Sequence, residues 1–382
     1  MKKKLFTSLG LMSGTSMDGV DLSLIKTDGD TEFSPVLDDY FEFDVKLQEK
    51  LINLRNLIFT SKDLEKYSIK LIEAEREFTL FNAKIINKII GEYNEKVDLI
   101  GFHGQTIFHN PNKKITKQLG DGKLLSQVTK KIVVNNFREK DLKNGGQGAP
   151  LTPIFHKLIS QNLLKKNKLS FPLNIINIGG ITNITQIEKN FNSFEKGLIA
   201  FDIAPGNCLI DEWVRNNSKN KFDENGTIAK SGKINDLILN QAIDNFEIST
   251  YQNSLDIKDF DVSFVKGLSL EDGCATLTKF SAILIAKGIE YINKLNDSIP
   301  ITNLVCGGGR KNFFLIKSIE ESLKNNNIKL QNIDLYEVNG DFIESQAFGY
   351  LSVRTLLNYP ITFPSTTNCK NPTIGGTINK NF

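Results

Sequence analysis

The chain has 382 residues, with 47 lysines and arginines against 44 aspartates and glutamates, so its formal net charge is only +3. So small an excess of positive charge argues against a protein that binds nucleic acid by neutralising phosphates. Its hydrophobic fraction of 40% and charged fraction of 24% are typical of a globular protein rather than a disordered one. The length corresponds to about two or three domains of ordinary size.

The four cysteines are far apart and form no C-x-x-C pair, which indicates neither a zinc site nor a disulfide framework. The apolar stretch after the lysines at 2–4 is short and is interrupted by Thr7 and Ser8, so we expect no signal peptide. No apolar run reaches the length of a membrane span. We therefore expect a cytoplasmic protein with neither a membrane nor a nucleic acid as partner.

The predicted elements alternate along the chain. Short apolar runs rich in β-branched or aromatic residues predict strands at 5–12, 97–102, 132–134, 174–178, 198–203 and 301–305. Apolar residues at helical spacing predict helices over about 61–93, 276–295 and 343–357. Strands and helices interleaved in this way predict an α/β fold.

Three glycine-rich clusters each follow a predicted strand, at 13–21, 177–185 and 306–310. Glycine just past the end of a strand allows backbone N–H groups to approach a ligand closely. Any one of these clusters could be no more than a tight turn. Three of them with hydroxyl or charged neighbours favour a phosphate-rich ligand that is held from several sides.

The first cluster reads S-G-T-S-M-D-G-V-D and lies between two apolar runs, which predicts the tip of a β-hairpin. Thr15 and Ser16 offer hydroxyl groups and backbone donors for phosphate. The carboxylates of Asp18 and Asp21 could hold Mg²⁺ directly or through water. The cluster is not a Walker A loop, because G-x-x-x-x-G-K-[ST] is absent.

The second cluster, N-I-G-G-I-T-N-I-T, predicts another hairpin, and A-F-D-I-A-P-G-N follows it at 200–207. Asp202 is expected at the carboxyl end of a strand, where open α/β sheets place their ligands. A carboxylate in that place is a candidate general base, and the alternative is a cap for the following helix.

The third cluster, V-C-G-G-G-R-K-N at 305–312, puts three consecutive glycines after a strand. They leave room for a flat ligand such as a purine against the backbone, and the alternative is a loop without a ligand.

Three further strings complete the pattern: G-F-H-G-Q-T at 101–106, G-G-Q-G-A-P-L-T-P at 145–153 and E-S-Q-A-F-G-Y-L at 344–351. Together and in this order, the motifs closely resemble the anhydro-N-acetylmuramic acid kinase family over nearly the whole chain. The resemblance implies the actin-like (ribonuclease H-like) ATPase fold of actin, hexokinase and Hsp70, with two α/β lobes around an interdomain cleft. We expect lobe I to span 1–135 plus about 356–382, with the first phosphate hairpin and part of the sugar site. Lobe II is expected to span 136–355, with the second hairpin, the catalytic aspartate and the adenosine-binding glycines.

The resemblance also implies the reaction. ATP, with Mg²⁺, would phosphorylate O6 of 1,6-anhydro-N-acetylmuramic acid while water opens the anhydro ring, giving N-acetylmuramic acid 6-phosphate for cell-wall sugar recycling. Asp202 would act as the catalytic base, Asp18 and Asp21 would hold the metal, and the protein would be a homodimer. The residues implied for the nucleotide are Gly14, Thr15, Ser16, Met17, Asp18, Gly19, Val20, Asp21, Gly179, Gly180, Asn183, Gly307, Gly308 and Gly309. Those implied for the sugar are His103, Gln105, Arg138, Asn207 and Glu344.

For three of the implied sugar residues a structural role is the alternative. His103 could be a buried structural histidine, Arg138 a surface ion-pair partner, and Glu344 a residue that only favours a helix N-terminus.

The sequence departs from the family pattern at four positions. Ile203 and Ala204 stand where the family has Thr and Gly, and we expect the Cβ of Ala204 to hinder a positive φ in the turn. Asn136 replaces an aspartate, and Ile257 replaces an arginine near the cleft, where Lys258 could substitute. A kinase of the same fold acting on a different sugar is therefore one alternative. A nucleotide-dependent, chaperone-like protein is a second, although no large client-binding region is evident.

Overall fold

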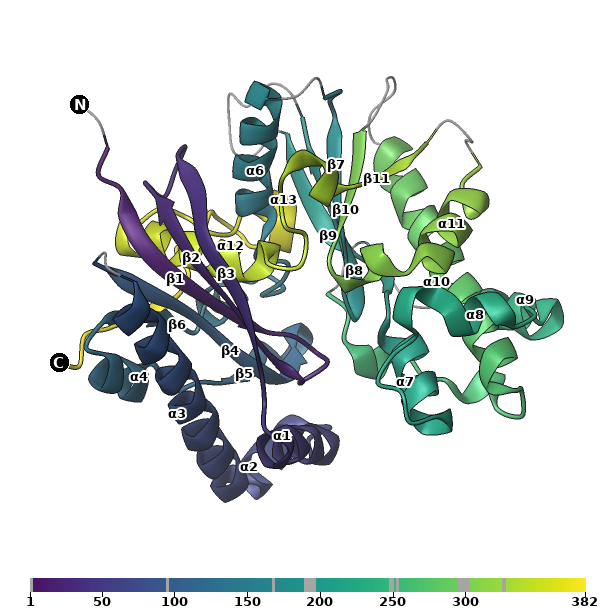
Figure 1. Ribbon diagram of the computed structural model, residues 1–382, viewed down its shortest axis with the longest axis horizontal. Coiled ribbons are helices and arrows are strands. Elements are labelled where there is room, and N and C mark those ends of the chain that lie inside the picture. The colour runs from purple at the N-terminus through teal and green to yellow at the C-terminus, as the bar shows by residue number, and fades with distance from the viewer. Residues whose placement is uncertain are drawn as a thin grey trace. The chain divides into compact units, whose positions relative to one another are not determined.

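The computed structural model describes residues 3–93, 96–166, 169–188, 197–246, 251, 254–294, 302–324 and 328–382. The chain forms two compact units, each with its own β-sheet (Figure 1). Unit 1 comprises Met1–Asn162 and Phe342–Phe382, and unit 2 comprises Leu163–Asp341. The predicted α/β class is confirmed.

Unit 1 is built on a seven-stranded sheet in the order β12-β6-β4-β1-β2-β3, with β5 paired to β4. β1, β4 and β6 run parallel, whereas β1–β2–β3 form an antiparallel meander. The strands are β1 (Phe6–Ser13), β2 (Gly19–Thr27), β3 (Phe33–Glu42), β4 (Leu99–Asn110), β5 (Ile115–Leu119), β6 (Ile132–Asn135) and β12 (Thr377–Asn379). β12 brings the end of the chain back to the first sheet.

The helix predicted over 61–93 is interrupted at Tyr67, whose φ of −106° and ψ of 22° end one helix before the next begins. The longer part, α3, turns its Leu71, Phe78 and Ile86 into the core beneath the sheet. The helices of this part of the chain are α1 (Val45–Leu57), α2 (Ser61–Lys66), α3 (Ser68–Glu92), α4 (Gly122–Thr129), α5 (Glu139–Lys143), α6 (Pro153–Lys166), α12 (Ile343–Leu356) and α13 (Pro364–Thr367), with the 3₁₀ helix η1 (Pro111–Lys113).

Helix α12 packs against the sheet of unit 1 and is drawn behind the purple strands in Figure 1. A Cβ on Gly10 of β1 would lie 1.9 Å from the Ser345 carbonyl oxygen, and one on Gly101 of β4 would lie 2.1 Å from that of Phe348. The helix backbone therefore touches the sheet backbone where both glycines lack a side chain. This contact explains why α12 belongs to unit 1, so that the second boundary lies at 341 rather than near 355; the first lies at 162 rather than near 135.

Unit 2 contains a five-stranded sheet in the order β11-β10-β7-β8-β9. β11, β10 and β7 are parallel, and β8 is antiparallel to both β7 and β9. The strands are β7 (Leu173–Ile178), β8 (Ile181–Ile187), β9 (Leu198–Pro205), β10 (Thr302–Cys306) and β11 (Leu330–Asn332). The parallel strands β7 and β10 end at the same edge of the sheet.

The core of unit 2 is organised by α10, which is longer than predicted because it begins six residues earlier, at Leu270. The helix predicted after the P-G-N turn is α7, and its Trp213 ring packs where Gly273 of α10 has no side chain. The helices are α7 (Cys208–Asn217), α8 (Thr227–Ser231), α9 (Asp236–Asp244), α10 (Leu270–Lys294) and α11 (Phe313–Ser322), with 3₁₀ helices η2 (Glu224–Gly226), η3 (Ile257–Asp259), η4 (Ser263–Val265), η5 (Gly308–Lys311) and η6 (Ile333–Tyr336).

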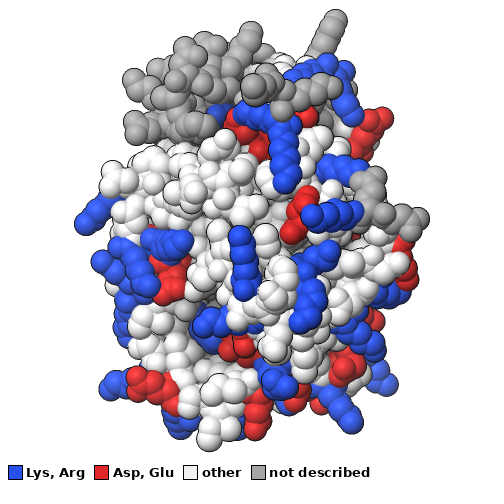
Figure 2. Space-filling view, turned by 90° about the vertical axis from the view of Figure 1, so that its left-hand side faces the viewer, with Lys and Arg blue, Asp and Glu red and all other residues white. Residues whose placement is uncertain are grey.

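In the described part of the chain, no helix combines the length and the apolar character that crossing a bilayer requires. On the face drawn in Figure 2, basic and acidic side chains are interspersed rather than gathered by sign.

We predict that Gly10→Ala destabilises the protein by about 1–3 kcal/mol or more, because the new Cβ would overlap backbone atoms of α12 that have no room to move. Urea unfolding measures the change. Gly91→Ala is the matched control, since a Cβ at this helical position meets nothing within 4 Å. It should leave stability unchanged or raise it by up to about 1 kcal/mol. Equal unfolding midpoints for Gly10→Ala and the wild type would contradict the proposed packing.

Candidate active site

The first glycine cluster forms the predicted hairpin tip between β1 and β2, with Met12 opposite Asp21 in register. Met17 adopts a φ of +56° and its side chain is fully buried in the core of unit 1. Thr15 and Ser16 are exposed beside it. Met17 and Val20, both implied for the nucleotide, therefore place their side chains in the core. The side-chain groups at the tip that remain open to a ligand are the exposed hydroxyls.

Side chains from elsewhere in unit 1 hold this tip in shape. The Gln105 amide nitrogen donates to the Gly14 carbonyl (3.0 Å), and its oxygen accepts from the Ser13 hydroxyl (2.6 Å). Arg55 donates to the Thr15 carbonyl (2.7 Å). Because β4 continues to Asn110, Gln105 is a buried strand residue next to the tip. The sequence assigned Gln105 to the sugar, and in the structure both ends of its amide are bonded to the tip of the β1–β2 hairpin.

Carboxylates gather at the base of the tip. Burial raises the pKa of the Tyr40 phenol, and the charges of Asp18, Glu42 and Asp21 raise it further. Asp18 also accepts a hydrogen bond from Ser16 (2.6 Å). Among the described residues, no three His, Cys, Asp or Glu side chains converge as a metal site. The oxygens of Asp18 and Asp21 suit Mg²⁺, but phosphate or water would have to supply its remaining ligands.

His103 and Arg138 contact one another in unit 1. Arg138 donates through Nε (3.1 Å) and Nη2 (3.0 Å) to Nε2 of His103, and through Nη1 (2.7 Å) to the Gly148 carbonyl. Nδ1 of His103 lies 2.8 Å from the Gly104 carbonyl, so it carries the proton. Burial, and then the charge of Arg138, hold the pKa of His103 well below its usual range. His103 is thus a neutral imidazole that orients a guanidinium.

Sequence reasoning missed Asp141, a fully buried carboxylate that holds the G-G-Q-G-A-P loop. It accepts hydrogen bonds from the Gly148 N–H (2.7 Å) and from the hydroxyls of Thr362 and Thr367. The loop that carries the Gly148 carbonyl is thereby tied to the C-terminal segment. An aspartate shortly before a glycine-rich stretch was the only signal in the sequence.

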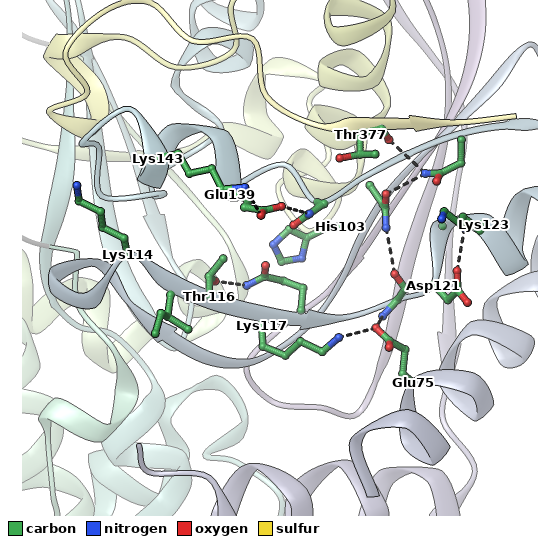
Figure 3. A pocket seen from close by; sticks show the side chains of 17 residues that line it. Glu75, His103, Lys114, Thr116, Lys117, Asp121, Lys123, Glu139, Lys143 and Thr377 are labelled. Atoms are coloured by element: carbon green, nitrogen blue, oxygen red, sulfur yellow. Dashed lines mark hydrogen bonds and ion pairs between the residues drawn. The ribbon is translucent and has the colours of Figure 1, made fainter. Parts of the chain in front are cut away.

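A cavity of about 580 Å³ lies within unit 1, between the β4–β5 hairpin and the starts of α4 and α5 (Figure 3). His103 lines it, as do the ion pairs Lys117–Glu75 (2.9 Å) and Lys143–Glu139 (2.5 Å). Of the residues implied for the sugar, His103 is the one that lines this cavity within the described chain.

In unit 2, the P-G-N turn rests on the tip of the β7–β8 hairpin. The N–H of Asn207 donates to the Gly179 carbonyl (2.8 Å), and that of Gly206 donates to the Gly180 carbonyl (2.9 Å). A Cβ on Gly206 would lie 2.3 Å from the Gly179 oxygen, so only glycine allows this approach. The structure therefore joins a hairpin tip and a turn that are separated along the chain by two strands, β8 and β9.

The third glycine cluster reaches the same place from β10. Gly307 has a φ of +75°, and a Cβ on Gly309 would lie 2.2 Å from the Ile178 side chain at the end of β7. A Cβ on Gly308 would instead meet only Asn207, at 3.9 Å. Gly309 is needed for packing, and Gly308 leaves open space beside the P-G-N turn. Gly179, Gly180, Asn207 and the triple glycine thus converge at one edge of the sheet.

Asp202 is almost fully buried and accepts a hydrogen bond from the Leu255 N–H (2.9 Å). It faces Asn183 across the β8–β9 ladder, where the register shifts between Thr182 and Asn183. Asp202 does not end the strand as expected, because β9 continues three residues beyond it to Pro205. The segment around Leu255 holds this carboxylate, and Asn207, not Asp202, occupies the N-cap of α7.

Two buried oxygens near Asp202 have no hydrogen-bond partner among the described residues, Thr182 Oγ1 and Asn183 Oδ1. Thr182 Oγ1 lies beside the P-G-N turn, 2.9 Å from where a Cβ of Gly206 would be. Burying an unpaired polar atom costs about 1–3 kcal/mol, so such atoms indicate a missing partner. The sequence pointed to Asn183 but not to Thr182.

Three of the departures from the family pattern, Ile203, Ala204 and Asn136, fit their local surroundings. Ile203 is buried in the core against Gly288 of α10, which leaves room for its branched side chain. Ala204 has no positive φ and lies within β9, so the expected hindrance in the turn was wrong. Asn136 adopts a φ of +58°, which asparagine tolerates, and its amide donates to Glu139.

Glu344 lies in the first turn of α12, in unit 1. Its neighbour Gln346 donates to the Asp38 carboxylate (2.9 and 3.1 Å), and Ser345 is bonded to Ser23 (2.7 Å). The E-S-Q string thus anchors the start of α12 to the sheet. The role of Glu344 toward the sugar stays a prediction.

The sequence profile of the family described as anhydro-N-acetylmuramic acid kinase matches residues 6–381. The chain belongs to this family. A relative of that name from Pelagibacter ubique is 53% identical over 382 residues, covering 100% of both chains. Another from Zymomonas mobilis is 37% identical over 379 residues, covering 97% of this chain and 99% of its own.

Solved structures resemble the chain more distantly. A hexokinase from Schistosoma mansoni in complex with glucose has a TM-score of 0.40 and 12% identity, with coverage of 91% and 85% of the two chains. A gluconate kinase from Lactobacillus acidophilus has a TM-score of 0.41 and 10% identity, with coverage of 93% and 90%.

We predict that no histidine of the folded protein titrates near its usual pKa of about 6.5. Burial lowers the pKa of His109 and of His156 to about 3, and it lowers that of His103 as well. The unfolded chain takes up these protons below pH 6.5 while the folded chain does not, so stability falls as the pH drops below that value.

Imidazole proton shifts measured by NMR between pH 8 and 5.5 test this, since the chain has only three histidines. A resonance with a midpoint near 6.5 would contradict the buried, neutral assignment. Urea unfolding at the same pH values gives the accompanying loss of stability.

Proposed function

We propose that the protein transfers the terminal phosphoryl group of ATP to O6 of 1,6-anhydro-N-acetylmuramic acid. Water adds at C1 in the same reaction, and the products are N-acetylmuramic acid 6-phosphate and ADP. The observation that carries this proposal is the family match over residues 6–381, together with the 53% identical relative of equal length. The activity belongs to the recycling and catabolism of cell-wall amino sugars.

Family membership as a kinase implies the use of ATP. We assign its phosphates to the tip of unit 1, where Thr15 and Ser16 are exposed and the carbonyls of Gly14 and Thr15 are bonded inward. The adenosine is assigned to the glycine turns of unit 2, where Gly308 leaves space beside Asn207. A bound nucleotide would also supply a partner for the unpaired oxygens of Thr182 and Asn183.

Asp202 is the proposed general base. Its carboxylate is held by the Leu255 N–H, which orients it for proton abstraction. The attacking water would give its proton to this carboxylate and form a bond to C1 as the C1–O6 bond breaks. O6 is then free to accept the phosphoryl group, so the one base serves both halves of the reaction.

Mg²⁺ bound with the nucleotide would neutralise charge on the phosphates. Asp18 and Asp21 are the residues that would hold it, because their carboxylates lie at the base of the phosphate tip. Phosphoryl transfer otherwise depends on positioning and on N–H donors.

Arg138 is proposed to pair with the lactyl carboxylate of the sugar. Its guanidinium is permanently charged, and the neutral imidazole beside it adds no competing positive charge. His103, Asn207 and Glu344 complete the proposed sugar contacts. On the family resemblance we also propose a homodimer in the cytoplasm, which light scattering of the purified protein would test for its oligomeric state.

A kinase acting on a different sugar is the second candidate. The observation that favours it is the position of Ile257, which begins η3 two residues after the Leu255 N–H that holds Asp202. The arginine that the family places there is absent, so sugar recognition beside the base differs in this chain.

We predict that the purified protein releases ADP from Mg-ATP only when 1,6-anhydro-N-acetylmuramic acid is present. Mass spectrometry should show that the sugar gains one phosphate and one water. A gain of phosphate alone would demote Asp202 as the base for water. The absence of sugar-dependent ADP release would favour another sugar, to be found with a panel of anhydro and ordinary amino sugars.

We predict that Asp202→Asn lowers kcat by about 10³-fold or more, since the amide cannot take the proton. ATP binding should stay within about threefold of the wild type by calorimetry, because the glycine turns are untouched. Asp236→Asn, on the exposed first turn of α9, is the matched control and should retain full activity. Wild-type turnover in Asp202→Asn would refute the mechanism.

A further inference from the structure

The arginine of the C-G-G-G-R-K-N string has no assigned role, although an arginine next to a glycine-rich loop suggests a phosphate ligand. Arg310 is buried, with only 2% of its side chain exposed. A buried guanidinium is stable only where its charge and its donors are satisfied. Its partners in unit 2 therefore decide what it does.

The partners of Arg310 occupy four of its five donors. Nε donates to Asp334 (2.9 Å), and Nη1 donates to both Asp341 (2.6 Å) and the Gly307 carbonyl (3.0 Å). Nη2 donates to the other oxygen of Asp341 (3.1 Å), which completes a bidentate pair. With four donors occupied, the guanidinium has only one N–H group left that could bind a phosphate.

These bonds join the glycine loop to two further turns. The Gly307 N–H donates to the Gly340 carbonyl (3.0 Å), and the Gly340 N–H donates to Asp334 (2.8 Å). A Cβ on Gly340 would lie 2.6 Å from Nε of Arg310, so that turn packs against the guanidinium itself. Gly307, Arg310, Asp334 and Gly340 thus form a closed ring of hydrogen bonds.

The charges of the ring and of the side chains bonded to it balance. Lys311 donates to Asp341 (2.6 Å), so two cations face the two carboxylates of Asp334 and Asp341. Burial by itself would raise the pKa of Asp341, but the bonds from Arg310 and Lys311 outweigh it and hold that pKa below its usual range. The Asp341 carboxylate is therefore ionised at neutral pH, as its bidentate pair with Arg310 requires.

We infer that Arg310 is a positioning residue for the nucleotide: it holds the loop at Gly307–Gly309 in its ligand-binding shape through Asp334 and Asp341, without contacting the nucleotide. This inference rests on the proposed function, because it takes that loop as the adenosine site. Lysine cannot replace the planar fork, since a single ammonium does not make the bidentate pair and also reach Asp334.

The test is the kinetics of Arg310→Lys with ATP and sugar varied separately. We expect KM for ATP to rise about fivefold or more, with kcat at saturating ATP and KM for the sugar within about twofold of the wild type. Lys311→Met is the matched control, because Lys311 is 57% exposed and bonds the same carboxylate. It should change KM for ATP by less than about twofold.

A double-mutant cycle adds a second readout. Asp341→Asn should raise KM for ATP much as Arg310→Lys does, and the double variant should be no worse than either single one. Asp341 is partly exposed, so its variant tests the ring even if Arg310→Lys does not fold.

Calorimetric binding of ADP without sugar separates this inference from the proposed function. Failure of the wild type to bind ADP or ATP overturns both. Wild-type binding with equal affinity in Arg310→Lys overturns the inference alone, as does a lower melting temperature with unchanged KM for ATP. An equal rise in KM for ATP in Lys311→Met overturns it too, because charge rather than the fork would then be responsible.

Discussion

Direct contact of backbone with backbone, at positions where no side chain intervenes, is the constraint on which both units depend. In unit 1, Gly10 and Gly101 let α12 lie against β1 and β4, so the helix is buried almost throughout. In unit 2, Gly206 lets the P-G-N turn touch the β7–β8 tip. Because a Cβ at these places would overlap backbone atoms, the chain has little freedom to substitute them, and the loops they carry are held in definite positions.

Buried polar groups support the loops that these contacts bring together. Asp141 accepts from the glycine-rich loop at Gly148 and from two C-terminal threonines. His103, kept neutral by burial and by Arg138, orients a guanidinium that is also bonded to this loop. Arg310 is likewise bonded to the triple-glycine loop, and two carboxylates hold its guanidinium in place. In each case the interior tolerates a charged or polar side chain because hydrogen-bond partners satisfy it.

Residues beside the candidate site therefore divide between those whose side chains are open to a ligand and those whose side chains shape the loop. Met17 and Gln105 were both expected to touch a ligand, yet one fills the core and the other bonds the hairpin tip. Thr182 was not among the sequence candidates, yet its buried hydroxyl beside the P-G-N turn has no hydrogen-bond partner among the described residues. Proximity to a motif does not distinguish these roles, because the direction of each side chain depends on strand register.

The sequence by itself determined the α/β class, the strands before each glycine cluster, both hairpins and the family, because these depend on local periodicity and on contiguous strings of residues. Only the tertiary structure decided that α12 belongs to unit 1, that Leu255 holds Asp202 and that Asp334 and Asp341 hold Arg310. Each of these contacts joins segments that are distant in the sequence, and no local pattern encodes which partners packing will bring together.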